Sequence, residues 1–173
     1  MKKLLVSSLV FCALMVVNVA AAGTNFAGTN FAGTWVLDKS KSEGLPRGMD
    51  SAQSITMVVT QDDKQLTTET KVVGQDGTAN PSQPFAYKLD GSKTNVDVTG
   101  RMPGKASLSA KWMGDGKVLE LDQDRVLTIQ GNEVNVTVKE HWELADGGKV
   151  LKLHRTTESP RGTQESKLTF NKQ

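Results

Sequence analysis

Arg125, Glu140 and Arg155 are the residues of this chain whose types and spacing could do chemistry. Each lies in a segment where apolar side chains recur at every second position, and each occupies an apolar position of that pattern. Charged side chains are rarely buried unless they are paired. Two arginines and one carboxylate leave one positive charge unmatched, and an arginine fork can bind a ligand carboxylate bidentately. We therefore expect a ligand-binding cluster, with Gln123 and Tyr87 on the same face.

The same cluster also has structural explanations that need no ligand. The strands can leave the folded core before these positions, or a β-bulge can reverse the side-chain alternation before Arg125. The charges can also satisfy one another as a polar plug. These alternatives remain open at the level of sequence.

The elements that position the cluster are predicted by period-two alternation between Trp35 and Phe170. This alternation predicts about ten β-strands, and no segment keeps a helical period. The segment 38–50 contains two glycines and a proline, which favours a loop over a helical lid. A sheet with one apolar face loses its exposed edges when it closes on itself. The predicted fold is all-β, a single antiparallel up-and-down β-barrel.

Turn residues predict how the last five strands pair. Each turn fixes one register, and all four registers place apolar residues on a common face. The predicted pairs are Trp112 with Leu119 about Asp115-Gly116, Gln123 with Glu140 about Gly131-Asn132, Trp142 with Leu151 about a loop over 145–148, and Leu153 with Leu168 about Pro160-Arg161. In these registers Glu140 lies diagonal to both Arg125 and Arg155.

The chain begins with an expected export signal. Two lysines precede an apolar run and a stretch of alanines that ends at Ala22, which is typical of a cleaved secretory signal peptide. We therefore predict three parts: a signal peptide over 1–22, an N-terminal arm over 23–33 that carries a tandem copy of TNFAG, and the barrel domain over 34–173. The expected location is the periplasm or the exterior, with no membrane span in the mature chain.

Charge and residue types exclude several functions. Loss of Lys2 and Lys3 from 21 basic residues leaves 19, which match the 19 acidic ones, so nucleic acid is not an expected partner. The single cysteine, Cys12, is removed with the signal. His141, His154 and Glu143 are predicted on the outer face, with the two histidines diagonal and Lys152 opposite His141. We interpret these residues as solvent-exposed side chains and not as metal ligands, because metal sites need three or four converging ligands. We expect no metal, no cofactor and no catalytic group.

The segment Phe31-Ala32-Gly33-Thr34-Trp35 resembles the Gly-x-Trp opening of lipocalins. The up-and-down strands resemble the wider calycin group, which includes fatty-acid-binding proteins, here as a secreted bacterial β-barrel. The resemblance makes Gly33 and Trp35 a structural motif and implies an arginine, Arg155 or Arg161, packed over Trp35. It also implies binding of small apolar molecules. The chain departs from the group by lacking the C-terminal helix of lipocalins and the two helices that follow strand one in fatty-acid-binding proteins.

Two functions follow from these observations. The first is an exported, lipocalin-like protein that binds a small apolar or amphipathic molecule in the barrel, with a carboxylate as one option. The alternative is a non-enzymatic exported module with a filled barrel, which binds a protein partner or acts structurally through its loops. Cavity volume separates them, because ligand sites occupy about 300–1,000 Å³.

Overall fold

The computed structural model of the chain describes residues 28–46 and 48–173. The signal peptide predicted over 1–22 lies outside the described residues, and so do residues 24–27 of the first TNFAG copy. Among the described residues, no helix is long and apolar enough to cross a membrane.

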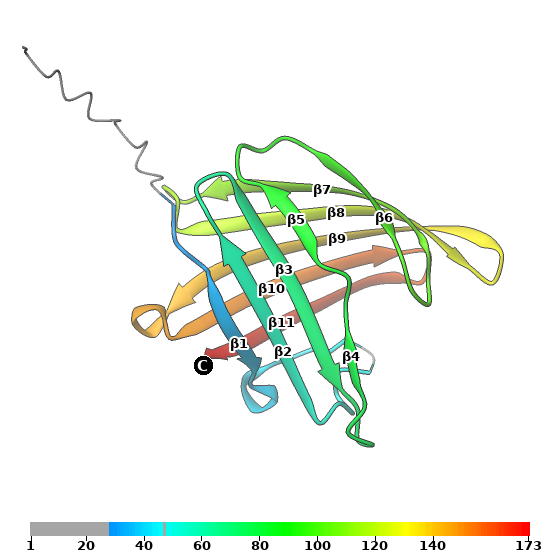
Figure 1. The fold of residues 1–173 in the computed structure, drawn as a ribbon, viewed down its shortest axis with the longest axis horizontal. Helices are drawn as coiled ribbons and strands as arrows, with labels where there is room; N and C mark the ends of the chain where they lie inside the picture. Colours follow the sequence, from blue (N-terminus) through cyan, green and yellow to red (C-terminus); the bar gives the residue numbers. More distant parts are fainter. Residues whose placement is uncertain (1–27, 47) are drawn as a thin grey trace, which may run out of the picture.

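The described residues form eleven β-strands and two short 3-10 helices (Figure 1). In chain order the elements are β1 (Gly33–Leu37), η1 (Lys39–Lys41), β2 (Ser54–Gln61), β3 (Gln65–Val73), β4 (Ala79–Pro81), β5 (Phe85–Lys88), β6 (Thr94–Val98), β7 (Gly104–Met113), β8 (Val118–Ile129), β9 (Asn132–Ala145), η2 (Asp146–Gly148), β10 (Val150–Ser159) and β11 (Gly162–Lys172). The all-β, antiparallel up-and-down fold predicted from the alternation is thereby confirmed.

A single sheet curls around one interior (Figure 1). Its strand order is β4-β3-β2-β1-β11-β10-β9-β8-β7-β6, and β5 pairs with β3 beyond the end of β4. The first and last strands close the curl, because β1 pairs with both β2 and β11. No ladder joins β4 or β5 to β6 in the described part of the chain. We call this interruption, between β4–β5 and β6, the seam.

Alternation along the strands builds the core. In β2, the buried residues are Ile55, Met57 and Val59, and the residues between them are more exposed. The same period continues in β7 and β8, so that apolar side chains from both halves of the sheet meet inside. Full burial of each large apolar side chain contributes about 1.5–3 kcal/mol. The fold therefore rests mainly on this interior face.

One end of the barrel is filled by aromatic side chains. Phe31 is fully buried, stacks on Trp112 at 6.1 Å between ring centroids and meets Trp142 edge-on at 5.8 Å. The side chain of Gln61 fixes the segment from two sides, since it accepts from the Phe31 amide at 2.8 Å and donates to the Thr29 carbonyl at 3.0 Å. The second TNFAG copy therefore packs into the fold.

The connection between β1 and β2 is a loop with one 3-10 turn, in line with the predicted absence of a helical lid. Glu43 forms an isolated bridge with Lys167 of β11. Gly44 takes a φ of +62°, and a Cβ there would lie 2.3 Å from the Glu165 carbonyl oxygen, so this position requires glycine. The loop then brings Met49 against the core. The described part of this loop thus covers part of the interior and contains no α-helix.

Two of the four predicted hairpin registers are confirmed: Trp112 pairs with Leu119, and Leu153 pairs with Leu168. The other two are wrong by two residues. The β8–β9 turn is centred on Gln130-Gly131, with Gln130 at a φ of 52°, and the loop after β9 spans 146–149. The observed pairs are Leu121 with Glu140, Gln123 with Val138, Trp142 with Leu153 and Arg155 with Glu140. A shift of two preserves the face of every side chain but changes its neighbours.

Candidate functional site

The predicted charged cluster lines one interior cavity of about 330 Å³. Four of the predicted residues contribute to its wall, namely Gln123, Arg125, Glu140 and Arg155. Apolar side chains from four parts of the chain complete the wall, among them Met49, Met57, Phe85 and Trp142. The cavity therefore combines a charged region with an apolar one.

Arg155 and Glu140 form an ion pair in which the carboxylate is buried and the guanidinium is partly exposed. They lie directly opposite on β10 and β9, where the sequence predicted diagonal neighbours. The Nη2 and Nε atoms of Arg155 lie 2.5 and 2.7 Å from Oε1 of Glu140, which is 4% exposed. Trp142 Nε1 donates to the other carboxylate oxygen at 2.9 Å. Both oxygens of Glu140 are engaged, so this carboxylate neutralises Arg155.

Arg125 is the cation without a carboxylate partner. Because Leu121 takes the position opposite Glu140, Arg125 is not the diagonal neighbour of Glu140 that was predicted. Arg125 does face Ala106 as predicted. Its Nη2 donates to Gln123 Oε1, and no carboxylate of the described residues lies within 4 Å of the guanidinium. The Nε atom is buried and has no hydrogen-bond partner among the described residues.

Burial lowers the pKa of Arg125, and the nearby Tyr87 and Glu140 act in the opposite direction. The guanidinium still remains protonated at neutral pH, because arginine titrates far above it. Its Cζ atom lies 5.2 Å from the ring centroid of Phe85, within the range of a cation–π contact. The structure therefore holds an unmatched positive charge beside an aromatic ring at the cavity wall.

Tyr87 is fully buried close to this group but is not among the residues that line the cavity. Its hydroxyl has no hydrogen bond of good geometry within the described residues. The side chain of Gln123 nevertheless lies close enough to favour the deprotonated form of this hydroxyl. Burial raises the pKa of Tyr87 strongly, and Glu140 adds to the rise. The side chain is thus a neutral phenol with a hydroxyl available to donate.

The cation above Trp35 is Lys172, not the arginine that the lipocalin resemblance implied. Lys172 lies opposite Trp35 in the β1–β11 ladder, with its Nζ 5.2 Å from the ring centroid. Arg155 is held by Glu140, and Arg161 is exposed in the β10–β11 turn. Gly33 lies beside the same side chain, since a Cβ there would come within 2.7 Å of Lys172 Cε. Gly33 and Trp35 therefore share Lys172 as a neighbour.

Sequence reasoning missed Phe85, Trp142 and Met49 as parts of the site. Phe85 shares a face with Tyr87, and Trp142 follows Glu140 by two residues on the same strand, so alternation alone could have placed both. Met49 could not be found in this way, because it reaches the cavity from an irregular loop.

A second cavity of about 440 Å³ lies at the seam. It shares Phe85, Arg125 and the segment 80–82 with the interior cavity. Its other wall comes from the segment 98–102 after β6, which includes the half-exposed Met102. We call this space the seam cavity. Arg125 is thus reached from both spaces.

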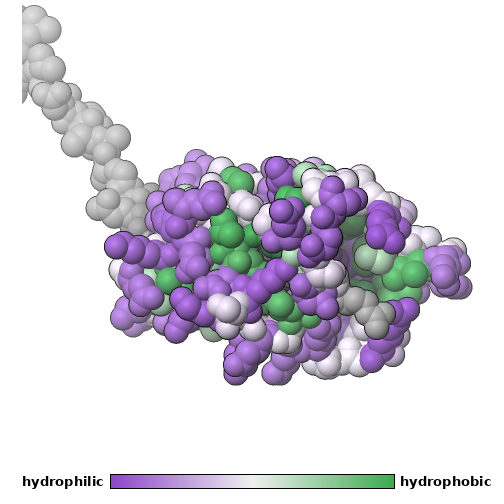
Figure 2. Space-filling model, turned by 90° about the horizontal axis from the view of Figure 1, so that it is seen from below, coloured by the Kyte–Doolittle hydropathy of each residue, from purple (hydrophilic) through white to green (hydrophobic). Residues whose placement is uncertain are grey.

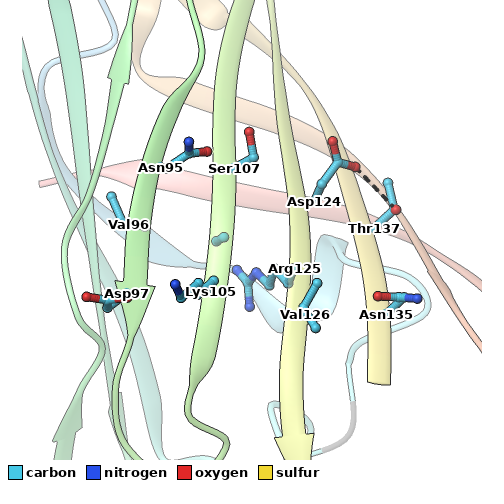
Figure 3. A pocket seen from close by; sticks show the side chains of 11 residues that line it. Asn95, Val96, Asp97, Lys105, Ser107, Asp124, Arg125, Val126, Asn135 and Thr137 are labelled. Carbon is cyan, nitrogen blue, oxygen red and sulfur yellow. Dashed lines mark hydrogen bonds between the residues drawn. The ribbon is translucent and has the colours of Figure 1, made fainter. Parts of the chain in front are cut away.

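Hollows on the outer face have a different character. One of them, of about 550 Å³, lies over β6 to β9 and is lined mostly by polar side chains such as Asn95 and Ser107, and Arg125 also contributes to its wall (Figure 3). In this hollow, Oδ2 of Asp124 lies 3.7 Å from Nζ of Lys93, so the lysine offsets the negative charge of the carboxylate. One face of the molecule is largely hydrophilic, with small separate apolar areas (Figure 2). These features favour solvent over a buried ligand.

His141 and His154 lie directly opposite each other on the outer face, not diagonally as predicted, and Lys152 faces Glu143. Their ring centroids are 6.5 Å apart, and His141 Nε2 lies 2.8 Å from a Glu120 carboxylate oxygen. No cluster of three or more potential metal ligands occurs within residues 28–46 and 48–173.

Comparisons with known proteins include a likeness to a solved structure. No family model matches the chain, and no curated protein does. A solved structure of the zebrafish ileal bile acid-binding protein, complexed with cholic acid, superposes with a TM-score of 0.48 at 13% sequence identity. The superposition covers 83% of this chain and 98% of that one.

Proposed function

We propose that this protein binds a small amphipathic molecule with an acidic headgroup inside its barrel, and that Arg125 anchors the headgroup. The observation that carries the proposal is the state of Arg125. It is a largely buried cation at the wall of a 330 Å³ cavity, its Nε has no hydrogen-bond partner, and no carboxylate of the described residues lies within 4 Å of it. The volume is within the range of about 300–1,000 Å³ for small-molecule sites.

Charge balance supports an anionic headgroup. The cavity holds two guanidinium groups and one carboxylate, and the carboxylate is committed to Arg155. An uncompensated cation in a low-dielectric interior is costly, and a bound anion relieves that cost through charge-assisted hydrogen bonds. Arg125 lines the cavity, and its buried Nε is a donor that such an anion can use.

The remaining wall supports an apolar body on the same ligand. Met57, Val72, Phe85 and Trp142 contribute apolar surface to the interior cavity. Burial of apolar ligand area supplies most of the affinity at such sites, while a few polar groups fix the orientation. The ligand class that matches both halves is an amphipathic acid, in keeping with the lipocalin-like and calycin-like pattern of the chain. The protein acts as a carrier or sensor, not as an enzyme.

We place this activity outside the cytoplasm, in the periplasm or in the surrounding medium. The support is the sequence alone: a charged start, an apolar run and alanines before residue 23. Intact-mass measurement of protein exported by a bacterial host tests the location. A mature chain that begins near Gly23 agrees with the proposal, and retained Met1 in a membrane fraction contradicts it.

A filled barrel that acts through its loops is the second candidate function. The observation that favours it is the aromatic packing of Phe31, Trp112 and Trp142, which fills one end of the interior. In this account the remaining cavity holds water, and the partner is another protein.

Native mass spectrometry of protein purified without denaturant distinguishes the two. We expect a co-purified acid of low molecular mass in the wild type and much less of it in Arg125→Met, which keeps most of the side-chain volume. Arg161→Met is the control, since Arg161 lies in an exposed turn. Equal occupancy in both variants, or an unliganded wild type that also fails to bind added dodecanoate, favours the filled barrel.

A further inference from the structure

The seam is the one long side of the sheet where strands face each other without a ladder, within the described residues. On one side β4 and β5 pair only with β3, and on the other side β6 pairs only with β7. By contrast, β8 and β9 are paired continuously from Val118 to Ile129. Regions with few backbone hydrogen bonds open at lower free energy than the rest of a fold. The seam is therefore the line along which the barrel opens first.

One side chain bridges the seam. Gln83, which lies between β4 and β5, donates through Nε2 to the Asp97 carbonyl at 2.6 Å. Its Oε1 accepts from the Thr99 amide at 2.9 Å and from the Thr99 hydroxyl at 3.1 Å. A primary amide offers the same donor and acceptor as a peptide unit. Gln83 thus occupies the hydrogen-bonding edge of β6 that a neighbouring strand would otherwise use.

The bridge lies beside a cavity that shares part of its wall with the candidate site. Gln83 and Thr99 line the seam cavity from its two sides. That cavity meets the interior cavity at Phe85 and Arg125, which contact each other through ring and guanidinium. One end of the barrel is filled by Phe31, which is fully buried.

We propose that the seam cavity is the route by which a ligand reaches Arg125, and that the side chain of Gln83 is the latch that holds this route closed. The inference rests on the proposed function, because it concerns access to the same site. Opening requires the loss of three hydrogen bonds from one side chain and no break in any ladder. An acidic headgroup that passes the latch meets Arg125 first, and its apolar part follows along Phe85.

The kinetics of a fluorescent probe test the latch. The probe is 1-anilinonaphthalene-8-sulfonate, an apolar anion, and the variant is Gln83→Leu, which keeps the size of the side chain and removes its hydrogen bonds. We expect association and dissociation rates to rise together by about threefold to tenfold, while the Kd stays within about twofold. The three lost hydrogen bonds are solvent-exposed, so their combined net effect is close to that of one ordinary hydrogen bond. Gln65→Leu is the matched control, since its exposed amide bonds only to Thr67 away from the seam.

A reversible cross-link provides the opposite perturbation. The substitutions Gln83→Cys and Thr99→Cys are made in a chain that also carries Cys12→Ser, and the two thiols are joined by a bifunctional reagent that contains a disulfide. We expect probe association to slow at least about tenfold and to recover when the link is reduced, because a gated route sets the rate.

The outcomes separate the two proposals. If the cross-linked protein binds the probe at the wild-type rate, or if Gln83→Leu leaves the rates unchanged, the proposed entry route is wrong. Neither result contradicts the proposed function. A wild type that binds neither the probe nor dodecanoate overturns the proposed function and the route together. A faster hydrogen exchange of the Thr99 amide in Gln83→Leu than in Gln65→Leu is expected in every case where the latch is correct.

Discussion

Arg155 and Glu140 lie directly opposite on neighbouring strands, with Nη2 of the arginine 2.5 Å from Oε1 of the carboxylate. This pairing divides the charged cluster into a neutral ion pair, Arg155 with Glu140, and a separate cation, Arg125. The Arg155–Glu140 pair is internally neutral and is held further by Trp142. Arg125 is left as the group that can attract a ligand.

The ion pair is predicted to matter for stability. Arg155→Met removes the partner of a carboxylate that is 4% exposed, and breaking a buried pair in this way costs about 3–5 kcal/mol of unfolding free energy. Denaturant unfolding of both proteins measures the loss. The double variant Glu140→Gln/Arg155→Met is the control, and it should recover part of the stability because no charge is left unpaired. A single variant within about 0.5 kcal/mol of wild type, the scale of an ordinary surface substitution, would contradict the account.

Phe31 is predicted to anchor the closed end of the barrel. Replacement of Phe31 by alanine removes a fully buried ring from between Trp112 and Trp142, and such changes cost about 3–5 kcal/mol. The tandem repeat supplies the control, since Phe26→Ala makes the same change in the first TNFAG copy and should leave the unfolding free energy near that of wild type. Equal losses in the two variants would show that the first copy carries the anchor as well.

Acid should weaken the fold through carboxylates in its turns. The backbone amides of Lys64 and Gln65 donate to Asp62 and hold its pKa below the ordinary value of 3.8. A folded pKa that is depressed contributes stability at pH values above 3.8, and this contribution is lost as the pH falls through the lower folded pKa. Asp76 and Asp90 are lowered in the same direction by Thr78 and Ser92, so the effects add.

Unfolding midpoints measured from pH 7 down to pH 2 test this. Asp62→Asn should flatten the acid limb of the profile, because the amide cannot titrate. Asp63→Asn, one residue along the same turn, is the charge-matched control and should follow the wild-type profile. An Asp62→Asn variant with an unaltered acid limb would rule out this source of pH dependence.

The fold could be predicted from the sequence because alternation determines which face a side chain takes, and that property survives errors of register. The two wrong hairpins show the limit. Gln130 adopts a positive φ, which is uncommon for a residue other than glycine, asparagine or aspartate. The sequence therefore predicts the β8–β9 turn one residue too late, and the predicted β8–β9 pairing is wrong by two residues. The shift in the β8–β9 hairpin moved Glu140 away from Arg125. The separate shift in the β9–β10 loop brought Glu140 directly opposite Arg155.

The parts of the site that sequence did not reveal depend on irregular backbone and on distant contacts. Met49 reaches the cavity from a loop without a repeating pattern. The Gln83 bridge depends on the position of two strand edges that do not pair. Lys172 lies over Trp35 because the C-terminal strand pairs with the first one, which the Gly33-x-Trp35 motif alone did not specify.

The central claim is that Arg125, and not Arg155, holds an acidic headgroup. Calorimetric titration of wild type, Arg125→Met and Arg161→Met with dodecanoate and with dodecanol tests it most directly. The account predicts that Arg125→Met weakens dodecanoate binding by about 1.5–3 kcal/mol, the range for a hydrogen bond to a charged group, while dodecanol binds both proteins alike. Arg161→Met should bind both ligands as wild type does. Equal affinity of the wild type for the acid and the alcohol would contradict the claim.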